Sequence, residues 1–241
     1  MSLDSRSVSR WIAAAGLILA PIVFALSDLI EPAWSDDSAE YLREVASGTN
    51  RHLAWGALWA IGGVLLLAGM IGVARLLRGG RGGAVGVVGA WMVGVSSAVV
   101  GGLLLALAVV ETAMADADRN PAEMVALYDA TEDVWLALVA FGTLFFGGLG
   151  LGTLLVAVGL LIRRPVPIWS PVLLIAWIVT IFVSPNRWVN LAAIVLILGA
   201  FAPVAARIAG MRNEQWERWQ PLPDAEPRAA RRAGGLQPSG S

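Results

Sequence analysis

The sequence predicts an all-α, polytopic membrane protein with six transmembrane helices and two short outer amphipathic helices. Composition is the first reason: 57% of the 241 residues are hydrophobic and only 15% are charged, whereas soluble domains carry about 25% charged residues. The second reason is that the hydrophobic residues fall into blocks about as long as a bilayer span, roughly 20 residues. A soluble fold of this length could not cover so much apolar surface with polar groups.

Six apolar blocks are long enough to cross a bilayer as helices. We expect spans at 11–30, 53–77, 84–110, 134–162, 168–183 and 188–206, of which the fifth is the shortest. The first block is too long for the apolar core of a signal peptide, and no clean small-residue cleavage site follows it, so we expect a retained span. The transmembrane domain therefore covers residues 1–210.

Residues 211–241 form a polar tail in which Pro, Gly, Ser and Arg predominate. Because such a composition cannot build a core, we expect a disordered cytoplasmic tail. Near its start, Trp216 and Trp219 are three residues apart, a spacing that allows a brief helix at the inner membrane interface.

The basic residues predict how the chain is oriented. All 17 are arginine, and with the amino terminus placed inside, only four fall in outer segments: Arg43, Arg51, Arg119 and Arg187. Arginines beside spans resist translocation, so both termini are expected in the cytoplasm. Most of the 18 acidic residues lie at the outer ends of spans, which predicts an acidic outer face.

Two short segments match one another at a shift of 83 residues. They read SAEYLREV (38–45) and PAEMVALY (121–128), and both have the pattern of an amphipathic surface helix. The matched positions are Glu40 with Glu123, Tyr41 with Met124, Leu42 with Val125 and Val45 with Tyr128. In the second segment Asn120 is the expected N-cap, with Pro121 at the first helical position.

The same shift aligns what surrounds the two segments. Each follows an apolar run that ends near a carboxylate, Asp28 or Glu111, and each precedes another span. We interpret 11–77 and 94–162 as tandem copies running in the same direction across the membrane. The third pair of spans, joined by SPNRW, lacks a surface helix, and the sequence does not show whether it is a reduced third copy.

Four polar residues near the outer ends of spans form a candidate outer vestibule: Asp28, Glu111, Arg51 and His52. Carboxylates inside a bilayer are costly and usually functional. However, Asp28 and Glu111 both lie near the outer interface, where a carboxylate reaches water. We interpret them as hydrated helix ends, with an ion or proton site as the alternative, and His52 as an interfacial histidine beside Arg51.

The sequence offers no catalytic, cofactor or metal-binding residues. There is no cysteine and only one histidine, so a zinc site, a bis-histidine haem site and an HExxH motif are all excluded. Ser96 and Ser97 lie near mid-span, out of reach of that histidine, so they do not form a serine nucleophile with a base.

Small residues four apart predict close helix contacts instead. Such pairs are Ser97 with Gly101, and Gly148 with Gly152.

Several stretches resemble a group of uncharacterised actinobacterial six-span integral membrane proteins that share a domain of unknown function. The resemblance rests on RWIAAAGLILAPIVFALSDLIEP, on a span ending in GVARLLRGGRG and on RRPVPIWSPVLL, and covers about residues 8–210. It implies a six-helix bundle in the bacterial cytoplasmic membrane. It assigns no catalytic or binding residue.

These observations predict a non-enzymatic integral membrane protein, either an accessory subunit or a binder of a lipid or another apolar ligand. The alternative is a small transporter or channel that uses the acidic outer vestibule. The expected partners are the lipid bilayer and either a membrane protein or a second copy of the chain, with no nucleic acid and no cofactor.

Overall fold

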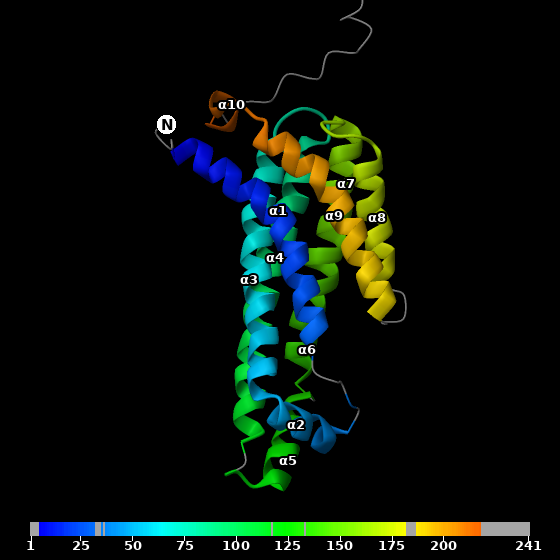
Figure 1. Cartoon of the computed structure of the whole chain (residues 1–241). Helices are drawn as coiled ribbons and strands as arrows, with labels where there is room; N and C mark the ends of the chain where they lie inside the picture. The colour runs from blue at the N-terminus through cyan, green and yellow to red at the C-terminus, as the bar shows by residue number, and fades with distance from the viewer. Residues whose placement is uncertain are drawn as a thin grey trace, which may run out of the picture.

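The computed structural model describes residues 5–31, 35, 37–116, 118–132, 134–181 and 187–217. Within these ranges the chain is helical and contains no strand, which confirms the all-α prediction. The elements are α1 (Ser5–Ile30), α2 (Ser38–Ser47), α3 (Thr49–Leu77), α4 (Gly83–Met114), α5 (Pro121–Glu132), α6 (Trp135–Gly142), the π-helix η1 (Thr143–Leu151), α7 (Gly152–Arg163), α8 (Trp169–Ile181), α9 (Arg187–Ala209) and α10 (Asn213–Glu217) (Figure 1).

Five apolar helical stretches in the described residues are long enough to cross a membrane. They are Ser7–Ile30, Thr49–Leu77, Gly83–Met114, Val139–Arg163 and Ala192–Ala209. Each coincides with one of the predicted spans. The remaining predicted span, 168–183, corresponds to α8, whose apolar part is shorter, and residues 182–186 lie outside the described ranges.

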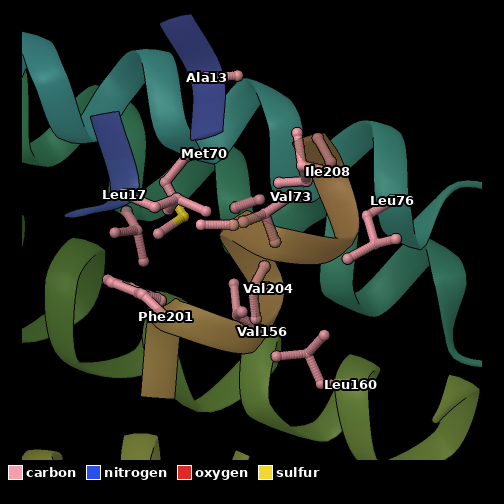
Figure 2. Close-up of a cluster of buried hydrophobic side chains, with 14 of the residues drawn as sticks. Ala13, Leu17, Met70, Val73, Leu76, Val156, Leu160, Phe201, Val204 and Ile208 are labelled. Carbon is pink, nitrogen blue, oxygen red and sulfur yellow. The ribbon is translucent and has the colours of Figure 1, made fainter. Parts of the chain in front are cut away.

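The long helices pack as a closed ring in the order α1, α3, α4, α7, α8 and α9, with α9 returning to α1. The pairs α1/α3, α4/α7 and α8/α9 are three helical hairpins arranged around one core. Figure 2 shows side chains from α1, α3, α7 and α9 gathered in that core. Leu17, Val73, Val204 and Ile208 are completely buried there.

Glycines allow α3 and α4 to approach within backbone contact. A Cβ atom added to Gly63 would lie 2.3 Å from the carbonyl oxygen of Ser97, and one added to Gly101 would lie 2.4 Å from that of Trp59. The Ser97 hydroxyl also donates a hydrogen bond of 3.2 Å to the Gly63 carbonyl. The predicted close contact at Ser97 and Gly101 is confirmed.

The predicted contact at Gly148 and Gly152 is confirmed as well. A Cβ atom on Gly148 would collide with the Ser96 hydroxyl at 1.7 Å, and one on Gly152 would lie 2.9 Å from Cβ of Met92. Both glycines therefore pack against α4. One feature differs from the prediction of a single α-helix over 134–162: its middle, Thr143–Leu151, is π-helical. This wider turn is rare, is associated with functional sites, and lies where the helix contacts α4.

The chain beyond residue 210 is partly folded, which corrects the prediction of a disordered tail from 211 onward. Met211 and Trp216 are buried, and α10 packs beside the start of α1. The brief helix expected near Trp216 is present, but its tryptophan faces the bundle. Trp219 and the rest of the tail, 218–241, lie outside the described residues.

Three arginines hold this carboxyl-terminal turn. Arg75 donates a 2.6 Å hydrogen bond to the Trp216 carbonyl, and its guanidinium lies 4.5 Å from the centre of the Trp216 ring. Arg78 donates to the Gln215 carbonyl and Arg10 to the Met211 carbonyl. The sequence assigns Arg10, Arg75 and Arg78 to the cytoplasmic side of the membrane. In the structure they also donate hydrogen bonds to backbone carbonyls that helix ends leave unpaired.

The opposite end of the bundle is covered by α2 and α5, which we call the cap (Figure 1). Asp37 caps α2 by accepting hydrogen bonds from the amides of Ala39 and Glu40. The Asn120 side chain caps α5 by accepting from the Ala122 amide at 3.1 Å, as the sequence predicts. In the capping interaction Glu123 accepts from the Asn120 side-chain amide instead of from its backbone N–H.

Candidate functional site

The two cap helices share one small hydrophobic core. It consists of the buried residues Tyr41, Leu42, Val45 and Met114, against which Ala115, Met124, Val125 and Tyr128 pack. All six apolar positions that match at the 83-residue shift occur in this cluster. The Tyr41 and Tyr128 rings lie 5.5 Å apart. The amphipathic faces of the two segments therefore meet each other and the end of α4.

Beneath the cap, the Glu111 carboxylate of α4 contacts one residue of α2 and one of α3. Its Oε2 atom accepts a hydrogen bond of 3.0 Å from the Tyr41 hydroxyl of α2. The same atom lies 2.7 Å from Nε2 of His52, which belongs to α3. The His52 and Glu111 side chains are only 1% and 2% exposed. Tyr41, His52 and Glu111 are called the buried polar cluster below.

The packing of α3 against α4 explains why His52 meets Glu111. The two helices are antiparallel neighbours, and Gly56 is so close to Ala108 that an added Cβ atom would lie 2.9 Å from the Ala108 side chain. One turn further toward the cap, the same alignment brings residue 52 opposite residue 111. The His52 ring is held in place by stacking on Trp55, with ring centres 5.5 Å apart and an angle of 15°.

The environment of His52 favours one tautomer. Its Nδ1 atom is buried and has no hydrogen-bond partner in the described residues. A hydrogen on Nδ1 would be a buried donor without an acceptor, which is costly. The hydrogen is therefore placed on Nε2, where it is donated to Glu111.

The Tyr41 hydroxyl is biased toward its neutral form. Burial raises the pKa of Tyr41, and the nearby negative charge of Glu111 and the hydrogen bond to it raise it further. Only the neutral phenol can donate this hydrogen bond, so Tyr41 ties α2 to α4 as long as it keeps its proton.

The predicted vestibule is assembled only in part. His52 and Glu111 meet, and both side chains are buried, so the interpretation of Glu111 as a hydrated helix end is wrong. His52 pairs with Glu111, not with its sequence neighbour Arg51. Arg51 instead forms an ion pair with Glu44 on the surface of the cap. Asp28 is half-buried on α1 and makes no hydrogen bond to the buried polar cluster within the described residues.

Sequence reasoning missed Tyr41 as a polar partner. The amphipathic pattern places Tyr41 on the apolar face of its helix, and it does pack there. A buried tyrosine usually needs a hydrogen-bond partner for its hydroxyl, which the sequence could have indicated. The identity of that partner depends on how α2 lies across α4.

A half-open groove runs along the surface of the cap. It has a volume of about 240 Å³ and is lined by parts of α2, α5 and the end of α4. Leu42, Met114, Met124 and Val125 give it an apolar floor. The charged residues at its rim are Arg43, Arg119 and Asp116.

The described residues offer no ready metal site. No three His, Asp or Glu side chains come together in these ranges in a way that could hold a metal ion. In the buried polar cluster the ligand-forming groups are one imidazole and one carboxylate.

Comparisons of the chain with models of protein families, with curated proteins and with solved structures find no match.

Proposed function

We propose that the protein is a non-enzymatic, multi-pass protein of the bacterial cytoplasmic membrane that binds a lipid or another apolar ligand in the groove of its cap. In this proposal α8 is the sixth span, as in the six-span actinobacterial group that the sequence resembles, and both termini are cytoplasmic. An accessory role toward another membrane protein is compatible with such a binding site.

The position of charges supports the orientation. Arg10, Arg75 and Arg78 gather at the end of the bundle that carries α10, and the cap lies at the other end (Figure 1). Arginine-rich ends of spans stay on the cytoplasmic side. The cap, with its many acidic residues, then lies outside.

The length of α4 supports placing the cap at the outer headgroup layer. At about 1.5 Å per residue, its 32 residues extend over about 48 Å. The hydrocarbon core of a bilayer is about 30 Å thick, and about 40–45 Å with the headgroups. The end of α4 and the groove beside it are therefore within reach of lipid headgroups.

The observation that carries the proposal is the apolar floor of the groove. Small ligands bind in concave, mostly apolar surfaces that carry a few polar groups, and the groove combines such a floor with a charged rim.

Blocking the groove tests the proposal. Ala46 lines the groove, so Ala46→Trp should fill it. After extraction in a mild detergent, native mass spectrometry of the wild type should show a retained lipid or apolar molecule that Ala46→Trp loses. Ser47→Trp, one residue further along α2 and outside the lining, serves as the control and should retain it. Equal retention by all three proteins would contradict the proposal.

A second candidate function, a small proton or cation transporter using the acidic outer vestibule, is favoured by one observation. Buried ionisable residues in membrane bundles often mark ion pathways, and Glu111 and His52 form such a pair. Proton or cation flux in proteoliposomes that Glu111→Gln abolishes would support it. Flux no greater than in protein-free liposomes would exclude it.

A further inference from the structure

We propose that the ligand of the cap groove is an anionic phospholipid of the surrounding outer leaflet, with its phosphate held between Arg43 and Arg119 and its glycerol region on the apolar floor. This inference rests on the proposed function and specifies the ligand class. The occupant is identified by the charge at the rim, the size of the groove and its height along the bundle.

The placement of the arginines is the first argument. Of the outer arginines whose side chains the structure describes, Arg51 is neutralised by Glu44. The other two, Arg43 and Arg119, both line the groove, and neither belongs to an ion pair within the described residues. Although the face is rich in carboxylates, the two guanidinium groups without an ion-pair partner lie at the same groove, and their positive charge favours an anion there. Asp116, also at the rim, offsets part of this charge.

The geometry of Arg43 suits a phosphate. Its Nε–H donates to the Ala39 carbonyl at 2.9 Å, which fixes the direction of the side chain along α2. The terminal nitrogens Nη1 and Nη2 keep their donors for a ligand. Guanidinium groups bind phosphate through paired, charge-assisted hydrogen bonds, which are stronger than neutral ones.

The size of the groove decides which part of the lipid enters. About 240 Å³ is below the roughly 300–1,000 Å³ typical of pockets that enclose a whole small ligand. The groove accommodates a phosphate and the adjoining glycerol, while the acyl chains remain in the bilayer. The partly exposed floor residues Met124 and Val125 then contact the least polar part of the headgroup region.

The test compares anionic with zwitterionic lipid on the full-length protein. Wild type, the double variant Arg43→Gln/Arg119→Gln and the control Arg51→Gln are reconstituted in nanodiscs containing equal amounts of phosphatidylglycerol and phosphatidylcholine. After detergent release, native mass spectrometry counts each lipid that stays bound. Because all three arginines are exposed, the variants should fold, which far-ultraviolet circular dichroism verifies.

We expect the wild type and Arg51→Gln to retain phosphatidylglycerol in preference to phosphatidylcholine. In the double variant this preference should fall by about tenfold, the size of change that corresponds to losing 1.4 kcal/mol of differential binding. High salt should weaken the preference only where the arginines are present, because exposed charge interactions are screened.

Three results would overturn the inference, and they separate it from the proposed function. Equal retention of both lipids by the wild type, with both lost in Ala46→Trp, would leave a lipid-binding groove without headgroup selectivity. An unchanged preference in the double variant would place the anion site elsewhere. A stoichiometric protein bound in place of lipid, and released by Ala46→Trp, would show that the groove holds a protein partner.

Discussion

At the scale of single residues, the buried polar cluster is the feature most sensitive to change. One carboxylate oxygen of Glu111 serves both Tyr41 and His52, and all three side chains are almost fully buried. A buried carboxylate is tolerated only when hydrogen bonds replace its lost hydration. Removing either partner leaves part of that cost uncompensated.

Tyr41→Phe should therefore destabilise the folded protein. Loss of a hydrogen bond to a buried charged group is expected to lower the free energy of unfolding by about 1.5–3 kcal/mol. Denaturation in detergent micelles measures this change. As a control, Ser38→Ala removes a hydroxyl that also donates to a carboxylate, Asp129, but at the exposed surface of the cap. Its effect should be clearly smaller, and equal effects would contradict the role of burial.

The raised pKa of Tyr41 predicts a loss of stability in alkali. The folded protein favours the neutral phenol, so this contribution is fully present below the pKa of a free tyrosine, about 10. It declines as the pH rises above that value, because the unfolded chain then releases a proton that the folded chain keeps. Unfolding midpoints measured between about pH 8 and 11 should fall more steeply for wild type than for Tyr41→Phe. Parallel curves would show that Tyr41 ionises as readily in the folded protein as in the unfolded chain.

At the scale of elements, glycine decides how closely the helices approach. Lipid supplies no hydrophobic drive for helices to associate, so close van der Waals packing must hold them together. The contact between α3 and α4 places Gly63 and Gly101 against backbone carbonyls, and this alignment in turn sets His52 beside Glu111. A substitution that pushes α3 and α4 apart at these glycines should thus also disturb the contact between His52 and Glu111.

Two neighbouring glycines of α4 provide a matched test. A Cβ atom on Gly101 would lie 2.4 Å from the Trp59 carbonyl oxygen, whereas one on Gly102 would have nothing within 4 Å. Gly101→Ala should destabilise the bundle by about 1–3 kcal/mol through overpacking. Gly102→Ala should be neutral or stabilise it by up to about 1 kcal/mol through helix propensity. Thermal unfolding in detergent compares them, and an equally tolerated Gly101→Ala would mean that α3 and α4 are further apart.

At the scale of the whole molecule, three hairpins close into a ring whose ends differ in chemistry. One end holds arginines that bind the carboxyl-terminal turn, and the other carries the cap over the buried polar cluster. The hairpin of α8 and α9 completes the ring between α7 and α1.

The two ends should face opposite sides of the membrane. Because the chain contains no cysteine, single cysteines can be labelled without background. A membrane-impermeant maleimide added to intact cells should label Ser47→Cys in the cap. It should label Arg81→Cys, between α3 and α4, only after permeabilisation. Labelling of Arg81→Cys in intact cells would reverse the orientation.

The helical class, the positions of five long apolar helices, the capping of α5 and the glycine contacts could all be predicted from the amino-acid sequence. These features depend on local composition and on helical spacing, which are written in consecutive residues. Three features emerge only from the three-dimensional packing: Glu111 and His52 are buried, Tyr41 donates a hydrogen bond to Glu111, and residues 211–217 belong to the folded part. Hydropathy shows only how near a residue lies to the end of an apolar stretch, and Glu111 and His52 both lie near such ends. Whether such a residue meets water depends on what covers that end, and Tyr41, which contacts Glu111, lies 70 residues earlier in the chain.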